Sequence, residues 1–431
     1  MTRGRRLVAL VAQSIPCICL LGTGASAATL RTLYSFAGGS DGLAPQSAPA
    51  IGANGVLYGT TVEGGNTQCA SPFGCGTVFA LTPPASYGES WTKTIVWGFG
   101  GPGDGVAPTG ELTVGSGGVL YGVTEAGGGG ACADGCGVVF ALSPPAQAGG
   151  SWTEAVLYSF AGGTDGAGPA SNIAIGPGGV LYGATAGGGT AGAGTVYALT
   201  PPISEGGTWT ETILHSFAGG LDDGEAPTSV VLGKDGVLYG TTVGGGSMTN
   251  AGTVFSLSPT PAAPSGWGEK VLVRFAGYWA KSDAECPLTN IVIGSGGTLY
   301  GTTGSIPSAF SVLPPSTVGG SWTEAILNSS YSLGRPEGNI VLSAKTGTIY
   351  GTSATGGGSS PICGDVGCGT VWSLSPPTTE GGAWVLTILH SFEGTDGGGP
   401  VGGISERSSV LYGTTAGGGA YNAGTVFQLA P

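Results

Sequence analysis

One short phrase recurs seven times along the chain and constrains its fold more than any other feature. The phrase contains an aliphatic residue, tyrosine and glycine, and successive copies lie 63, 61, 57, 61, 50 and 62 residues apart. Its tyrosines are Tyr58, Tyr121, Tyr182, Tyr239, Tyr300, Tyr350 and Tyr412. Such a repeat indicates a chain built from one supersecondary unit, because a single unit cannot bury its apolar face alone.

Three further phrases separate one tyrosine from the next, and each is typical of a short strand. The second phrase is Gly-Thr-Val-Phe-x-Leu or a near copy, and it ends at Leu81, Leu142, Leu199, Leu257, Leu313, Leu374 and Leu429. The third phrase alternates apolar with polar residues and begins at Trp91, Trp152, Trp209, Trp267, Trp322 and Trp384. The fourth is a short apolar run such as residues 172–175. Each unit therefore holds four predicted strands and no predicted helix.

Seven such units predict an all-β, seven-bladed β-propeller with four strands in each blade. A β-helix would need much shorter coils, and tandem β-sandwiches would need about 100 residues per domain. Residues 30–36 repeat the third phrase with no unit before them, whereas the chain stops on a second phrase at Leu429. We expect the N-terminal strand to complete the last blade beside residues 424–429, which closes the ring and removes exposed sheet edges.

Glycine follows the tyrosine of every unit, inside a predicted strand where it lowers the strand propensity. These glycines are Gly59, Gly122, Gly183, Gly240, Gly301, Gly351 and Gly413. We interpret them as positions where a neighbouring blade approaches closely. The tryptophans of the third phrase occupy one fixed place in each unit, which favours packing over stacking on sugar rings.

The N-terminus carries the features of a secretory signal peptide. Arg3, Arg5 and Arg6 precede an uncharged apolar run at residues 7–21, and Ala25-Ser26-Ala27 follows. We predict cleavage near Ala27, which leaves residues 28–431 as a single repeat domain. No later run reaches the roughly 20 apolar residues of a membrane span. We therefore expect a secreted monomer, extracellular or periplasmic, without a transmembrane segment.

The charge of the chain restricts its partners. Only 9% of the residues are charged, and the formal net charge is −13. Removal of the three signal-peptide arginines makes it more negative still. Nucleic acids and anionic membrane surfaces need a basic footprint, so we exclude them. Neutral glycans, envelope proteins and cations remain as partners.

Six cysteines form three pairs, each in the loop between the first and second phrases of a unit. The pairs are Cys69 with Cys75, Cys132 with Cys136, and Cys363 with Cys368. In an exported protein this pattern favours three local disulfides. Zinc is the alternative, but pairs spread over separate units lack the usual ligand spacing. Cys286 has no partner nearby in the sequence.

An Asp-x-x-x-Pro motif recurs between the third and fourth phrases. Its aspartates are Asp41, Asp104, Asp165, Asp223, Asp283 and Asp396. Most are followed by glycine, which is typical of a turn whose carboxylate accepts local backbone hydrogen bonds. Alternatively, the carboxylates line one rim of the channel and contact sugar hydroxyls or a hard cation such as Ca²⁺. No unit has the dense Asp-x-Asp-x-Asp pattern of a calcium loop, so we predict no dedicated metal site and no cofactor.

The fifth unit departs most from the repeat and is our candidate ligand patch, because symmetric positions mostly serve packing. The patch consists of Arg274, Tyr278, Trp279, Lys281, Asp283 and Glu285. The alternative is an eroded unit with a longer loop. Arg335 and Glu337 break the pattern of the sixth unit in a similar way.

Catalytic constellations are scarce. The two histidines, His215 and His390, occupy the third-phrase place held elsewhere by Tyr34 and Tyr158. We interpret them as interchangeable strand residues and predict no catalytic residue.

Gly-Val-Leu-Tyr-Gly-Thr-Thr at 55–61 and 236–242, with Gly-Thr-Val-Phe at 76–79 and 252–255, resembles a known tandem repeat. It is the GloVer (Gloeo_Verruco) repeat of exported bacterial "choice-of-anchor" proteins. The resemblance covers essentially the whole mature chain and implies export and a repeat β fold, but no activity. Members of that family often end in an anchoring tail, whereas this sequence stops on a predicted strand at Pro431, so we expect a free product.

These features favour a non-enzymatic binding or cell-envelope interaction module with a glycan or protein partner. The alternative is an enzyme acting on extracellular polysaccharide, a lyase or glycosidase with carboxylates at the channel rim. A third hypothesis is a cation-bound structural component of the envelope.

Overall fold

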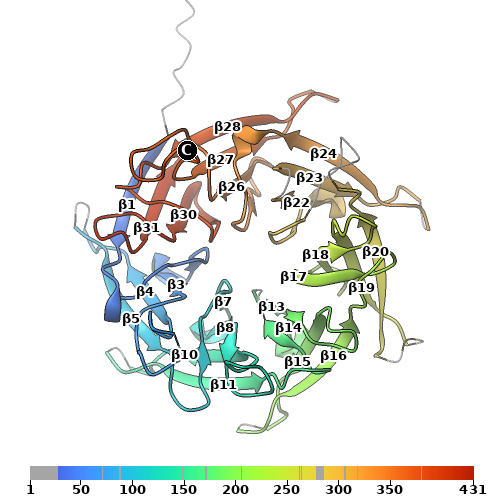
Figure 1. Ribbon diagram of the computed structural model, residues 1–431, viewed down its shortest axis with the longest axis horizontal. Helices are drawn as coiled ribbons and strands as arrows, with labels where there is room; N and C mark the ends of the chain where they lie inside the picture. The colour runs from blue at the N-terminus through green and yellow to red at the C-terminus, as the bar shows by residue number, and fades with distance from the viewer. Residues whose placement is uncertain are drawn as a thin grey trace, which may run out of the picture.

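Seven small antiparallel sheets stand around a common axis and form a closed ring (Figure 1). The structure is a computed structural model that describes residues 28–431 except for 70, 87–88, 148, 170–171, 205, 262, 264, 278–285, 305–306, 318 and 380. Each sheet is one blade, with its fourth-phrase strand nearest the axis and its third-phrase strand outermost. The predicted seven-bladed propeller of four-stranded blades is confirmed.

The blades follow the order of the chain from blade 1 to blade 7. Blade 1 contains β2 (Ala50–Ile51), β3 (Leu57–Thr61), β4 (Thr77–Thr82) and β5 (Thr92–Gly98). Blade 2 contains β7 (Thr113–Val114), β8 (Leu120–Thr124), β10 (Val138–Ser143) and β11 (Thr153–Ser159). Blade 3 contains β13 (Ala174–Ile175), β14 (Leu181–Gly187), β15 (Thr195–Thr200) and β16 (Thr210–Ser216), and β12 (Ala167–Pro169) also pairs with β14. Blade 4 contains β17 (Gly224–Leu232), β18 (Leu238–Gly245), β19 (Thr253–Pro259) and β20 (Trp267–Arg274).

The remaining blades repeat this arrangement. Blade 5 contains β21 (Val292–Ile293), β22 (Leu299–Thr303), β23 (Ser308–Leu313) and β24 (Thr323–Ser329). Blade 6 contains β25 (Val341–Leu342), β26 (Ile349–Ser353), β27 (Thr370–Ser375) and β28 (Val385–Ser391). Blade 7 contains β29 (Ile404–Arg407), β30 (Val410–Thr415), β31 (Thr425–Ala430) and β1 (Thr29–Ser35). A small extra ribbon pairs β6 (Gly105–Val106) with β9 (Ala126–Gly127).

The helical segments of the described chain are single 3₁₀ turns. They span Gly39–Asp41, Ala53–Gly55, Ser116–Gly118, Pro177–Gly179, Ser295–Gly297 and Tyr331–Leu333.

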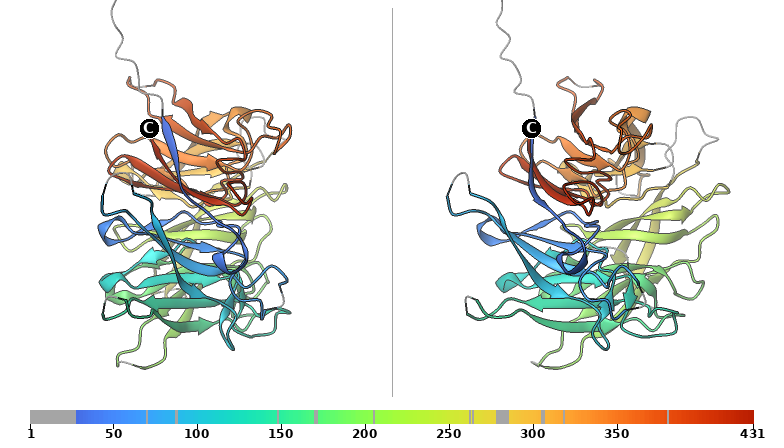
Figure 2. Two further views of the ribbon diagram at one scale, coloured as in Figure 1. Left: turned by 90° about the vertical axis from the view of Figure 1, so that its left-hand side faces the viewer. Right: turned by 60° about the vertical axis from the view of Figure 1, so that its left-hand side comes forward.

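The two ends of the chain close the ring within blade 7. Strand β1 runs antiparallel to β31, with Leu30 opposite Leu429 and Ser35 opposite Thr425. Figure 2 shows this N-terminal strand in blue beside the red C-terminal strands. The predicted closure is therefore confirmed, and every blade gains its outer strand.

The hydrophobic core lies between blades rather than in one central mass. One cluster combines Val78 and Val96 of blade 1 with Leu120 and Phe140 of blade 2. The cluster at the closure joins Phe36, next to β1, to residues of blades 1 and 7. Because both faces of each sheet pack on a neighbour, the second-phrase strands are buried over nearly their whole length.

The glycine that follows each tyrosine makes room for an aromatic ring of its own blade. Gly59 lies opposite Phe79 on the adjacent strand, and a Cβ on Gly59 would come 2.5 Å from Phe79 Cζ. The same relation joins Gly183 to Tyr197 and Gly351 to Trp372. Our interpretation that a neighbouring blade approaches these glycines is wrong, because the large side chain of the second phrase folds back over its cross-strand partner.

Contacts between neighbouring blades repeat around the ring. The third-phrase tryptophan of one blade meets the first-phrase tyrosine of the blade before it, as in Trp152 with Tyr58, where the ring centroids are 5.7 Å apart. Ala107, which precedes the proline of the Asp-x-x-x-Pro motif, donates its backbone N–H to the carbonyl of Cys75 in blade 1 at 3.0 Å. These tryptophans are packing residues, as predicted from their regular spacing.

Candidate functional site

Two cavities meet on the axis of the ring, and both are lined by the segments that lead into the innermost strands. Their volumes are about 270 Å³ and about 490 Å³. Glu111, Asn172 and Asn290 line both cavities, and Asn339 lines the first. We call Glu111, Asn172, Asn290 and Asn339 the waist, because they stand where the two halves of the channel meet.

The four waist residues are equivalent in the repeat. Each lies three positions after the proline of its unit, and these prolines are Pro108, Pro169, Pro287 and Pro336. All four side chains are half-buried. The repeat therefore aims the same position of blades 2, 3, 5 and 6 at the axis.

Hydrogen bonds draw the waist together. Asn339 Nδ2 donates to Glu111 Oε2 at 3.1 Å, which joins blade 6 to blade 2 across the channel. Asn339 Oδ1 accepts from the Asn290 N–H at 3.2 Å, and Asn290 Oδ1 accepts from the Ile340 N–H at 3.1 Å. The channel is thus pinched by side chains from blades that are not neighbours in the ring.

Two acceptors of the waist are poised for a ligand. Burial raises the pKa of Glu111 to about 7, although the hydrogen bond from Asn339 acts in the opposite direction. At neutral pH this carboxyl group therefore populates both a donor form and an acceptor form. Asn172 Oδ1 is buried and, within the part of the chain that the structure describes, has no hydrogen-bond partner. Because a buried acceptor without a partner costs free energy, a ligand that donates a hydrogen bond to this oxygen would gain binding free energy.

The rest of the channel is lined mainly by neutral groups. The first cavity presents hydroxyl, amide and small side chains, and its charged residues are Glu111 and Glu337. Glu337 is paired with Arg335, whose Nε lies 2.9 Å from Glu337 Oε1. The second cavity contains Glu406, which accepts from Ser343 Oγ at 3.0 Å. No Lys, Arg or His appears among the described residues that line either cavity.

The repeated aspartates that the structure describes lie away from the channel, beside the outermost strands, and Asp283 lies outside the described residues. Asp41 accepts from the Tyr34 hydroxyl and from the Ala37 N–H, both at 2.8 Å. Asp165 does the same with Tyr158 and Ala161, both at 2.6 Å. Neither cavity is lined by Asp41, Asp104, Asp165, Asp223 or Asp396. These contacts are those of the turn interpretation, and the placement is not that of a ring at the channel rim.

Each of four aspartates also faces one residue on the outer strand of the next blade. Lys93 Nζ lies 2.7 Å from Asp41 Oδ1 at the seam where blade 7 meets blade 1. In the next three seams the facing residue is a glutamate. The pairs are Asp104 with Glu154, Asp165 with Glu211, and Asp223 with Glu269.

The pKa values of these seam glutamates are raised. Burial raises the pKa of Glu154 to about 8, with a further contribution from the charge of Asp104. Burial and the charge of Asp165 raise the pKa of Glu211 to about 7. The seams therefore hold carboxyl groups that keep a proton at pH values where an exposed glutamate has lost it.

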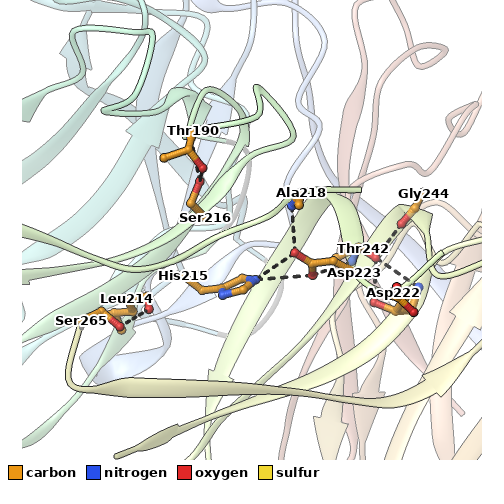
Figure 3. A network of polar contacts seen from close by, with 12 residues as sticks. Thr190, Leu214, His215, Ser216, Ala218, Asp222, Asp223, Thr242, Gly244 and Ser265 are labelled. Carbon is orange, nitrogen blue, oxygen red and sulfur yellow. Dashed lines mark hydrogen bonds and ion pairs between the residues drawn. The ribbon is translucent and has the colours of Figure 1, made fainter. Parts of the chain in front are cut away.

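A histidine pairs with the motif aspartate at the seam between blades 3 and 4 (Figure 3). His215 Nε2 lies 3.4 Å from Asp223 Oδ1 and 3.2 Å from Oδ2. Asp223 also accepts from the N–H groups of Ala218 at 2.8 Å and Gly224 at 2.7 Å. One ligand atom each of His215, Asp223 and Glu269 lies within 4.8 Å of the others. His215 thus takes the place of the tyrosine that pairs with the aspartate in other units.

The predicted patch of the fifth unit is described in part. Arg274 Nε and Nη2 donate to the carbonyls of Leu221 and Asp222 at 3.3 and 3.0 Å, in the turn that leads into β17. The other members of the patch lie outside the described residues, namely Tyr278, Trp279, Lys281, Asp283 and Glu285. The patch stays a prediction, and its first residue is engaged with backbone carbonyls.

A model of one protein family decides where this chain belongs. It is described as the Gloeobacter/Verrucomicrobia repeat, and it matches residues 129–361, more than half of the chain. The chain belongs to this GloVer repeat family. The resemblance stated from the motifs is thereby confirmed. No curated protein matches the sequence significantly.

Solved structures similar to this GloVer protein share its fold at low sequence identity. Virginiamycin B lyase from Staphylococcus aureus has 14% identity and a TM-score of 0.52, covering 94% of this chain and 99% of that one. A fungal alcohol oxidase of the AA5 family, in complex with copper, has 14% identity and a TM-score of 0.55, covering 94% and 76%. A protein from Lactobacillus plantarum has 15% identity and a TM-score of 0.51, covering 83% and 91%. At these identities the similarity concerns the fold alone.

All three predicted disulfides of the GloVer chain are confirmed. They join Cys69 to Cys75, Cys132 to Cys136, and Cys363 to Cys368, and each clips a loop between the first and second phrases. Cys286 is a free thiol. Disulfides of this kind indicate an oxidising compartment outside the cytoplasm. Across the described part of the chain, no helix has the length and apolarity needed to cross a membrane.

Sequence reasoning missed the waist of this GloVer propeller. The signal was present, because the third residue after the motif proline is Glu111, Asn172, Asn290 or Asn339 in four units. In the remaining units that place holds small or aliphatic residues, which hid the pattern. The seam glutamates were also missed, since they lie in the third phrase, far in sequence from the aspartates that they face.

Proposed function

We propose that this GloVer protein is an exported, non-enzymatic binding module whose channel takes a neutral, hydroxyl-rich ligand such as a segment of a glycan. The observation that carries the proposal is the waist, where Glu111 and three asparagines converge on the axis between two cavities. Amide and carboxyl groups offer the paired donors and acceptors that sugar hydroxyls need. The absence of basic side chains among the described lining residues disfavours anionic ligands.

Export is part of the same proposal. The three disulfides need an oxidising compartment, and the N-terminal features favour a signal peptide that is cleaved near Ala27. A secreted or periplasmic monomer would meet envelope glycans and extracellular polysaccharides. N-terminal sequencing of the exported protein would test the cleavage site.

The binding proposal is tested on a glycan array followed by calorimetric titration of the best ligand. A hydrogen bond to a charged group contributes about 1.5–3 kcal/mol and one between neutral groups about 0.5–1.5 kcal/mol, so Glu111→Gln should weaken binding by roughly tenfold or more and Asn172→Ala by about two- to tenfold. Asp235→Asn, on an exposed turn outside the channel, is the matched control and should bind like the wild type. Equal affinity of the wild type and both waist variants would show that the ligand binds elsewhere, for example at residues 274–285.

One observation favours the enzyme alternative enough to test it in parallel. A carboxyl group with a pKa of about 7 is suited to general acid catalysis, and Glu337 lies in the same cavity as Glu111. Glycoside hydrolysis needs two such carboxyl groups on either side of the scissile bond. If the protein releases reducing ends from any member of a polysaccharide panel, and Glu111→Gln abolishes that release, the enzyme hypothesis replaces the binding module.

A further inference from the structure

We propose a divalent metal site of the zinc class at the seam between blades 3 and 4, formed by His215, Asp223 and Glu269. His215 lies on β16, the outer strand of blade 3, and Glu269 lies on β20, the outer strand of blade 4. Asp223 lies in the connection between the two blades, directly before β17. This inference is independent of the channel and of its proposed ligand.

The distances between His215 and Asp223 suit a shared small metal ion, and the Glu269 carboxylate lies close enough to join them. Metal bonds of 2.0–2.2 Å to nitrogen and oxygen, at tetrahedral angles, separate two ligand atoms by roughly 3.4 Å. The separations of His215 Nε2 from Asp223 Oδ2 and Oδ1 are 3.2 and 3.4 Å. The Glu269 carboxylate lies within the same 4.8 Å group. One imidazole and two carboxylates leave a fourth position for water.

The surroundings orient the ligands as outer-shell groups do in known metal sites. Both oxygens of Asp223 are held by backbone N–H groups, those of Ala218 and Gly224. Each oxygen keeps a lone pair for a metal, since a carboxylate oxygen accepts two bonds. Glu269 Oε1 is buried and has no hydrogen-bond partner among the described residues. Arg274, the nearby basic residue, donates instead to the carbonyls of Leu221 and Asp222.

An equivalent seam already holds a cation. Register places Lys93 and Glu269 at the same position, because Lys93 lies opposite Leu81 and Glu269 lies opposite Leu257, the last leucines of their second phrases. The Lys93 ammonium group lies 2.7 Å from Asp41, the counterpart of Asp223. The chain therefore supplies its own positive charge at the closing seam, and a bound metal would supply it at the seam of His215.

The repeat also contains a natural control. His390 Nε2 lies 2.7 Å from Asp396 Oδ2, in the same relation as His215 and Asp223. The third position of that seam is Leu30, which lies opposite Leu429 and offers no ligand atom. Within the described residues, the seam of His215 holds the one group of three His, Cys, Asp or Glu side chains whose ligand atoms all lie within 4.8 Å of one another.

The experiment uses the mature full-length protein without an affinity tag, stripped with a chelator and titrated with Zn²⁺ in a calorimeter and with Co²⁺ in a spectrophotometer. We expect one equivalent to bind, with Co²⁺ bands of a low-coordinate site. His215→Tyr restores the tyrosine–aspartate pair of the neighbouring seam and should fold, yet it should weaken binding by roughly tenfold or more. Glu269→Gln should do the same, whereas His390→Tyr should bind like the wild type.

Three outcomes would overturn the proposal. The wild type could bind neither metal at millimolar concentration, or both seam variants could bind with unchanged affinity and stoichiometry. Alternatively, His390→Tyr could lose as much affinity as His215→Tyr, which would indicate surface histidine binding. If His215→Tyr fails to fold, the isosteric Glu269→Gln decides between the outcomes. Glycan binding by the channel is measured separately, so failure of one proposal leaves the other standing.

Discussion

At the scale of residues, one position of the repeat shows which charged side chains a buried seam can hold. Lys93 is almost fully buried, with a side-chain exposure of 4%, and its ammonium group is satisfied by Asp41. The ammonium group also lies 5.1 Å from the centroid of the Phe36 ring and 5.4 Å from that of Tyr34. In the next three seams along the chain, a glutamate with a raised pKa takes this place. One position therefore tolerates either charge only when its surroundings neutralise it.

Lys93→Glu would give the closing seam the aspartate–glutamate pair of the next three seams along the chain. Loss of one partner of a buried ion pair leaves the other uncompensated, so we expect a loss of about 2–4 kcal/mol in unfolding free energy at pH 8. Much of the loss should vanish at pH 5, where the new carboxyl group can stay protonated. Denaturant titrations at both pH values measure this. Lys270→Glu, the same charge change at an exposed residue of β20, should cost little.

Gly59→Ala tests the aromatic ring that lies over each first-phrase glycine. The added Cβ would come 2.5 Å from Phe79 Cζ, so the ring must move within a packed core. We expect a destabilisation of about 1–3 kcal/mol, the usual range for overpacking. Gly98→Ala is the matched control, because a Cβ there meets no atom within 4 Å and the residue also lies in a strand. Equal melting temperatures for the two variants would contradict this account.

At the scale of elements, the N-terminal strand is an essential part of the seam between blades 7 and 1. Strand β1 and the residue after it bring Leu33 and Phe36 into the core cluster between blades 7 and 1. Phe36 packs edge-on against Phe79, with centroids 5.2 Å apart. The Phe36 N–H also donates to the Gly424 carbonyl at 2.9 Å. Without this strand, β31 would be an exposed edge.

Deletion of residues 28–36 should therefore destabilise the whole ring. Burial of Leu33 and Phe36 contributes about 1.5–3 kcal/mol each, before the lost backbone pairing is counted. We expect thermal unfolding to begin well below the wild-type temperature, and a synthetic peptide of residues 28–36 to restore part of the loss. An unchanged melting temperature of the deletion variant would refute the role of β1 in closure.

At the scale of the whole molecule, the glutamates with raised pKa values lie in two places, at the axis and at the outer seams. Glu111 stands at the axis, and Glu154, Glu211 and Glu269 stand at the outer seams. Burial is the first cause of the raised pKa in each, to about 7 or, for Glu154, about 8. In contrast, hydrogen bonds from Lys93 and His215 hold the pKa values of Asp41 and Asp223 below the usual range, against the effect of burial.

Stability should consequently fall as the pH rises from about 5 to about 8. A glutamate with a raised folded pKa stabilises the fold below its unfolded pKa, and this contribution is lost as the pH passes through 7–8. The aspartates with lowered pKa values lose their contribution only below about pH 4. Calorimetric scans of chelator-treated protein at low salt measure the trend. The triple variant Glu154→Gln, Glu211→Gln, Glu269→Gln should flatten it, and a wild-type melting temperature that rises toward pH 8 would contradict this interpretation.

The sequence by itself determined the features that recur in each unit and the pairing of the two ends of the chain. Seven copies of four strand phrases predicted the blades, the unmatched phrases at residues 30–36 and Leu429 predicted the closure, and paired cysteines predicted three local disulfides. Such features are readable because strand periodicity, turn residues and short cysteine spacings act over a few residues.

Only the tertiary structure decided which side chains meet between blades. The described motif aspartates lie at the outer seams, and the rings over the glycines belong to the same blade, although the sequence was compatible with other placements. The contact of Glu111 with Asn339 spans 228 residues of the sequence and joins blades 2 and 6, which are not neighbours in the ring. The radius and registration of the closed ring set that distance, and these depend on the packing of all seven seams together.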